Sequence, residues 1–161
     1  MTMETNTARE LFRHTLATLA YRGGKTLRES GADFAQFRAG ENTRTPLEIL
    51  AHIGDLMEWA LSIAKGKEEW KKADLGTWDQ EVARFFASLK AFDDYLASAA
   101  PLGCSAQQLF QAPIADALTH VGQLAMLRGL AGNPIRSESY FAADIVTGRV
   151  GAERSAPRFE F

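Results

Sequence analysis

Residues 46–64 read PLEILAHIGDLMEWALSIA, and residues 113–127 read PIADALTHVGQLAML. In each segment apolar side chains would cover most of the circumference of a helix, while the few polar positions recur at helical spacing and share one narrow stripe. A helix at the protein surface would instead carry charged residues over a whole outer face. The two segments therefore predict two largely buried helices, each with a narrow polar stripe.

Four capping boxes predict the starts of four helices. In a capping box, a hydroxyl side chain and a Glu or Gln three residues later satisfy each other's backbone N–H groups. The box at Thr45 is the strongest, because Pro46 occupies the first helical position, where its missing N–H costs nothing. Four starts predict an all-α four-helix bundle. The four pairs are Thr7 with Glu10, Thr45 with Glu48, Thr77 with Gln80, and Ser105 with Gln108.

Glycine and proline residues indicate where these helices end. The pair Gly23-Gly24 predicts a kink in the first helix or a close approach by another part of the chain, with simple tolerance as the alternative. The predicted helices run from Thr7 to a stop at Gly31, from residue 46 to about 65, from residue 78 to about 99, and from Ser105, with a restart at Pro113, to Gly132.

The remaining segments are expected to be connections and a tail. The link from Gly66 to Gly76 is long enough either for a crossover along the bundle or for a plain hairpin. Beyond the fourth helix we expect a short extra helix near residues 140–146 and an extended C-terminal tail over about residues 147–161. We read residues 1–161 as a single domain.

Composition favours a cytoplasmic protein. No stretch is apolar for the roughly 18 residues that a membrane span needs, and no secretory or transit signal is visible, so we expect no membrane partner. Cys104 is the only cysteine, which excludes a disulfide within the chain. The net charge of −2, with basic residues spread along the sequence, argues against nucleic acid as a partner.

His52, Asp116 and His120 are the residues most able to carry chemistry. Asp116 and His120 are four apart and share one helix face. A carboxylate in so apolar a segment is costly unless it has a partner, so we expect Asp116 to be buried and paired. His52, the lone histidine of the other apolar helix, would complete a two-histidine, one-carboxylate set that binds a divalent transition metal with positions left open. The alternative is a structural polar network.

Other polar side chains surround this predicted site. Gln123 extends the stripe of Asp116, and Asp55, one turn from His52, is a candidate for orienting a metal ligand. His14 matches no ligand position and is expected to be structural or exposed. The segment after the fourth helix is expected to fold over the site and contains Glu138, Tyr140 and, as a candidate fourth ligand, Asp144. The aromatic residues expected in the core, with a pocket wall as the alternative, are Trp59, Trp70, Trp78, Phe85 and Phe86.

The segments TPLEILAHIGDL (45–56), LTHVGQL (118–124) and LRGLAG (127–132) resemble the DinB/YfiT-like superfamily. The resemblance covers about residues 11–151 and implies a four-helix bundle with a histidine triad, one histidine on the second helix and two spaced by four on the last. His52 and His120 match the first and third ligands. Asp116 stands where the remaining histidine would be, and this harder ligand shifts the preference from zinc toward nickel, manganese or iron.

The resemblance implies a metal-dependent small-molecule enzyme, either a thiol-dependent S-transferase or a hydrolase. Zinc, nickel, manganese or iron would lower the pKa of a bound low-molecular-weight thiol or water. No residue identifies itself as a general base. The alternative is a non-catalytic helical bundle that binds a small molecule or a protein and keeps Asp116 and His120 as a polar network. A homodimer is the default expectation for the oligomeric state.

Overall fold

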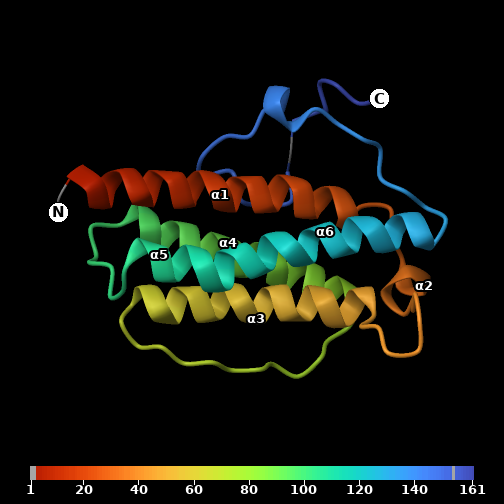
Figure 1. Ribbon diagram of the computed structural model, residues 1–161, viewed down its shortest axis with the longest axis horizontal. Helices are drawn as coiled ribbons and strands as arrows, with labels where there is room; N and C mark the ends of the chain where they lie inside the picture. The colour runs from red at the N-terminus through yellow and green to blue at the C-terminus, as the bar shows by residue number, and fades with distance from the viewer. Residues whose placement is uncertain (1–2, 154) are drawn as a thin grey trace.

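The computed structural model describes residues 3–153 and 155–161 (Figure 1). Within these residues there is no β-strand beyond an isolated bridge between Glu138 and Glu160, so the predicted all-α class is confirmed. No helix in this part of the chain has both the length and the apolar character needed to cross a membrane. The elements are α1 (Met3–Leu27), α2 (Ala32–Ala35), α3 (Pro46–Ala64), α4 (Trp78–Ala97), α5 (Ala106–Leu109), the π-helical turn η1 (Phe110–Ile114), α6 (Ala115–Leu130) and the 3₁₀ turn η2 (Tyr140–Ala142).

The four long helices α1, α3, α4 and α6 pack side by side around one core. α3 lies against α4 and α6, and α1 also lies against α4 and α6, so α1 and α3 occupy opposite corners. Leu16, Leu50, Leu89 and Leu124, one from each long helix, are essentially inaccessible to solvent.

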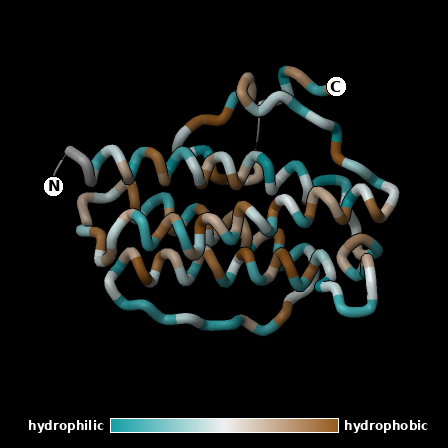
Figure 2. The backbone as a smooth tube through the Cα atoms, in the orientation of Figure 1, coloured by the Kyte–Doolittle hydropathy of each residue, from teal (hydrophilic) through white to brown (hydrophobic). Residues whose placement is uncertain are grey.

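The segment between α3 and α4 is a crossover, which settles the alternative that the sequence left open. It runs back along the whole length of α3, so α3 and α4 point in the same direction (Figure 1). Hydrogen bonds hold it in place: Ser62 Oγ pairs with the backbone of Glu69, and the Ala73 N–H donates to Asp55. Figure 2 shows that this segment is mostly hydrophilic, whereas α3 beside it is rich in hydrophobic residues.

Three of the four predicted capping boxes are confirmed, at Thr45, Thr77 and Ser105. The box at Thr7 is wrong, because α1 already begins at Met3 and Thr7 lies inside the helix. A hydroxyl residue followed by Glu three positions later also occurs within helices, where the two side chains share one face. The motif alone therefore does not separate a helix start from a helix interior.

The predicted restart at Pro113 is also wrong. Helical structure continues from α5 through η1 into α6, and Pro113 lies within the π-helical turn. Proline lacks the N–H that an α-helix needs and clashes with the preceding turn, and a wider turn accommodates both defects. The predicted stop at Gly132 is correct, since Gly132 has a φ of 79° and follows the last turn of α6.

The C-terminal segment packs on α1. Its short helix is limited to η2, Tyr140–Ala142, rather than extending to residue 146. Glu138 is buried and accepts hydrogen bonds from Tyr21 Oη at 2.6 Å and Lys25 Nζ at 2.7 Å. Lys25 also pairs with Glu160 at 2.9 Å. These contacts attach the tail to the outer side of α1.

Gly23 allows close packing between α1 and α4, as one of the sequence alternatives proposed. A Cβ atom built on Gly23 would lie 2.6 Å from Cζ of Phe85, a fully buried ring. Gly122 on α6 has no such neighbour within 4 Å.

We expect Gly23→Ala to lower the free energy of unfolding by about 1–3 kcal/mol, because the new methyl group overpacks the core against Phe85. The matched control, Gly122→Ala, should raise it by about 0.5–1 kcal/mol through better helix propensity. Urea denaturation followed by circular dichroism measures both values. Equal effects of the two substitutions would contradict the close contact.

Candidate metal centre

The structure brings together the three predicted metal ligands. His52 lies on α3, and Asp116 and His120 lie one turn apart on α6, which runs antiparallel to α3. His52 Nε2 is 3.5 Å from Asp116 Oδ2, and His120 Nε2 is 3.4 Å from Asp116 Oδ1. One ligand atom from each residue fits within a group no wider than 4.8 Å.

The two histidine–carboxylate distances, each to a different oxygen of Asp116, are close to the spacing of ligand atoms around one ion. Ligand atoms that each lie about 2.0–2.2 Å from one ion in tetrahedral geometry are about 3.4 Å apart. The histidine–carboxylate contacts of 3.4 and 3.5 Å are longer than ordinary hydrogen bonds. Two imidazole nitrogens and one carboxylate oxygen are also a donor set that first-row transition metals accept.

Gln123 orients His120. Its Oε1 lies 2.7 Å from His120 Nδ1. An amide oxygen only accepts hydrogen bonds, so this contact requires a proton on Nδ1 and leaves the lone pair of the neutral ring on Nε2. Nε2 is the atom that faces Asp116. Gln123 therefore fixes the tautomer and ring orientation of His120, as a hydrogen-bond partner does for a metal-bound histidine.

His52 is held in its neutral form. Burial lowers its pKa below the ordinary value of 6.5, the charges of His120 and Arg44 lower it further, and Asp116 opposes them. At neutral pH the ring is uncharged, and a neutral imidazole is the form that binds a metal.

Asp116 is not buried, contrary to the expectation from the apolar sequence of α6. Its side chain is 46% exposed, whereas the His52 and His120 side chains are 22% and 10% exposed. The carboxylate therefore does not need a partner in order to be tolerated. The site lies at the rim of the groove between α3 and α6, with its open side toward solvent.

Asp55 contacts a different part of the protein from the one we expected. It is buried, and its Oδ1 accepts hydrogen bonds from Arg84 Nη2 at 2.6 Å and from the Ala73 N–H at 3.2 Å. Three residues correspond to about 300° of helical rotation, so His52 and Asp55 differ by about 60°. That angle is enough to turn Asp55 toward α4 while His52 faces α6.

The C-terminal residues do not fold over this site. Glu138 binds residues of α1, and Tyr140 makes an edge-on contact with Tyr21 of the same helix. Asp144 hydrogen-bonds Ser155 and Arg149 within the tail, and these bonds lower its pKa. His14 on α1 contacts Thr147. The structure brings none of them to the three ligands.

A cavity of about 580 Å³ opens beside the three ligands. This volume is within the range of small-molecule sites. Its residues include the three ligands and Gln123, together with an apolar surface and one cation, Arg44, that sequence reasoning missed. The remaining lining residues are Ala39, Thr43, Ile49, Met126 and Leu127.

Trp70 covers one side of His52. It lies on the crossover segment, and its ring centroid is 5.7 Å from that of His52 and 5.5 Å from that of Trp59. Trp70 is 46% exposed, so it is not the core residue that we expected. Trp78 and Phe85 are core residues as predicted, and Phe86 packs partly buried against the core.

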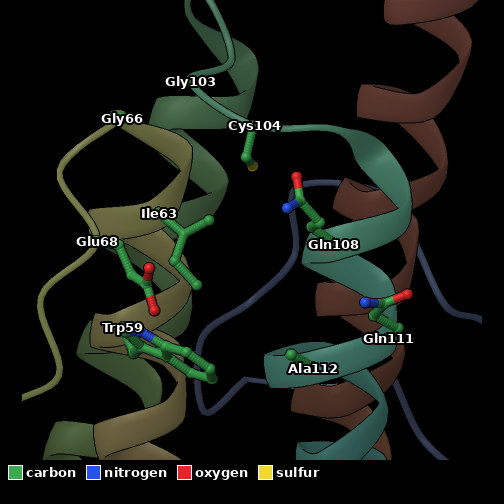
Figure 3. A pocket seen from close by; sticks show the side chains of 9 residues that line it. All are labelled: Trp59, Ile63, Gly66, Glu68, Gly103, Cys104, Gln108, Gln111 and Ala112. Carbon is green, nitrogen blue, oxygen red and sulfur yellow. The ribbon is translucent and has the colours of Figure 1, made fainter.

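A second cavity of about 400 Å³ lies between the C-terminal half of α3 and the segment formed by α5 and η1 (Figure 3). Figure 3 shows Trp59 and Ile63 on the α3 side and Cys104, Gln108 and Gln111 on the other. Burial raises the pKa of the Cys104 thiol, which favours its unreactive protonated form. Glu68 is its only other titratable lining residue, so this cavity has no ligand set like that of the first.

Comparisons of the chain with protein-family models, curated proteins and solved structures give no match. The facing side chains of His52, Asp116 and His120 and the cavity beside them are therefore the features of the chain that bear on its function.

In the metal-free protein we expect the His52 ring to titrate below pH 6.5. Arg44→Gln should raise its pKa, because a nearby positive charge is removed, and Asp116→Asn should lower it further, because a stabilising negative charge is removed. NMR titration of the ring protons measures both shifts, with the His52 signal assigned through His52→Gln. A pKa that neither substitution moves would contradict this electrostatic environment.

Proposed function

We propose that this chain is a metal-dependent small-molecule enzyme of the hydrolase or thiol-dependent S-transferase type, built on a DinB/YfiT-like four-helix bundle. One observation carries the proposal: His52, Asp116 and His120 present three ligand atoms within 4.8 Å of one another beside an open cavity. Three protein ligands with an accessible remaining position are typical of catalytic metal sites, whereas structural sites are closed by four.

The segments that carry the resemblance support the same proposal. The segment around His52 forms α3, and the segment around His120 forms α6, so the two sequences that resemble the superfamily face each other across one groove. The four long helices that surround one core also agree with a bundle.

A bound divalent metal would act as a Lewis acid and lower the pKa of a bound water or thiol to near neutrality. The residues of the chain position the reaction. His52 and His120 direct Nε2 atoms toward Asp116, Gln123 holds the His120 ring, and Trp70 excludes water from one side of His52. Asp116 is the only carboxylate that lines the cavity, and it is itself a ligand, so the lining residues contain no separate carboxylate base.

The non-catalytic alternative has weaker support from the geometry. A structural network would satisfy buried polar groups through direct hydrogen bonds. Asp116 is half exposed, and its distances to both histidines exceed ordinary hydrogen-bond lengths. Little in this arrangement would stabilise the fold without an ion.

We expect the purified protein to bind one zinc, nickel, manganese or iron ion per chain, and His52→Ala or Asp116→Ala to abolish stoichiometric binding. His14→Ala, which changes the histidine on α1, is the matched control and should bind as wild type does. Elemental mass spectrometry and isothermal titration calorimetry measure content and affinity. Metal bound equally by all variants, or by none including the wild type after soaking with each ion, would refute the site.

Gln123→Ala should weaken metal affinity about 10–100-fold, because the His120 ring loses the acceptor that orients it. Gln123→Glu, which keeps an acceptor for the Nδ1 proton, should retain affinity within a few-fold of wild type. Competition with a chelator of known affinity measures the constants, and thermal unfolding without metal checks that both variants are folded. Equal affinity of Gln123→Ala and wild type would show that Gln123 does not support a metal ligand.

A further inference from the structure

Arg44 is the one cationic residue among those that line the cavity beside the candidate metal centre. It is exposed, and among the described residues it makes no hydrogen bond or ion pair. Arg38 in the same loop differs, because it donates to the Thr43 carbonyl and lies 3.7 Å from Glu48. The Arg44 guanidinium group is therefore available to a ligand.

The position of Arg44 follows from the start of α3. It directly precedes Thr45, the N-cap of that helix, and its charge is close enough to lower the pKa of His52. Arg44 thus borders the cavity together with His52, and apolar surface from Ile49 and Leu127 lines the same cavity.

The charges of the cavity favour an anion. Asp116 is its single negative side chain, and a divalent cation together with Arg44 would outweigh that charge. The excess of positive charge would come from the bound cation, because Arg44 and Asp116 offset each other.

The cavity offers donors for a carboxylate rather than for a larger phosphate group. At the N-terminus of α3 the Thr45 and Glu48 N–H groups are already bound in the capping box and Pro46 has none, so few N–H groups remain for phosphate contacts. A single guanidinium matches the two oxygens of a carboxylate in a bidentate pair.

We propose that Arg44 determines specificity at this site and that the substrate is a small carboxylate with an apolar body. The carboxylate pairs with Arg44, and the apolar body lies on the surface of Ile49, Met126 and Leu127, next to the metal ligands. This inference rests on the proposed function, because it treats the cavity as the substrate site.

The test is a binding cycle with two probes of nearly equal shape, cyclohexanecarboxylate and the neutral cyclohexanecarboxamide. Isothermal titration calorimetry gives their affinities for wild type, Arg44→Gln, Arg44→Lys and Lys72→Gln, each with and without zinc. Lys72→Gln removes the same charge from an exposed position on the crossover segment that does not line the cavity. Elemental mass spectrometry of the same samples gives the zinc content.

We expect Arg44→Gln to weaken carboxylate binding about tenfold, equivalent to about 1.4 kcal/mol, and to leave carboxamide binding within about twofold. Arg44→Lys should recover part of the loss, and Lys72→Gln should change neither probe more than about twofold. Zinc content should be the same in all four proteins, because none of the substitutions removes a ligand.

Two kinds of result separate this inference from the proposed function. In the first, zinc fails to bind but Arg44→Gln still weakens carboxylate binding selectively. This result would refute the metal-dependent function and support the role of Arg44. In the second, the wild type binds no carboxylate at millimolar concentration, or Arg44→Gln weakens the binding of both probes equally or of neither. This result would refute the role of Arg44, and the zinc content would test the metal site independently.

Discussion

The burial of α3 between α4 and α6 is the constraint on which the rest of the structure depends. Most residues of α3 are buried, and Leu50, Ile53 and Met57 have essentially no exposed surface. Each such side chain contributes about 1.5–3 kcal/mol relative to an exposed one, so the helix must be covered on nearly all sides. Packing on α6 brings His52 to the two ligands of that helix, and the remaining edge is covered by the crossover segment.

This burial divides the polar stripe of α3 between two neighbours. Asp55 turns toward α4, where Arg84 links it to Glu58 and Glu81. His52 turns toward α6 and remains partly open to the cavity. Asp55, Arg84 and their partners form a structural ion-pair cluster, and Asp55 also fixes the crossover segment through the Ala73 N–H. His52 is not part of this cluster and remains available to an ion. One helix therefore supplies both a structural cluster and a candidate metal ligand.

The proposed chemistry is consistent with the solvent exposure of the side chains at the site. The two histidine side chains are largely enclosed, whereas the Asp116 side chain is half exposed, and burial lowers the pKa of His52, which favours its neutral form. A small molecule would approach from the side where Arg44 and apolar surface lie together. Trp70 on the crossover segment closes the neighbouring side of His52.

Local interactions explain what the sequence alone could determine. The capping boxes at Thr45, Thr77 and Ser105 act within one turn, and the pairing of Asp116 with His120 on one helix face needs only the helical repeat. The partnership of His52 with these residues was predicted from the apolar character of both helices and from the family resemblance. The predictions at Thr7 and Pro113 were wrong because a capping motif also occurs inside helices and a proline can lie within a wider helical turn.

Only the tertiary structure placed Arg44 and Trp70 beside the site, turned Asp55 toward Arg84, left Asp116 half exposed, and packed the tail on α1. Those outcomes depend on the path of long connections and on which helices become neighbours, and residue spacing within one helix carries no information about either.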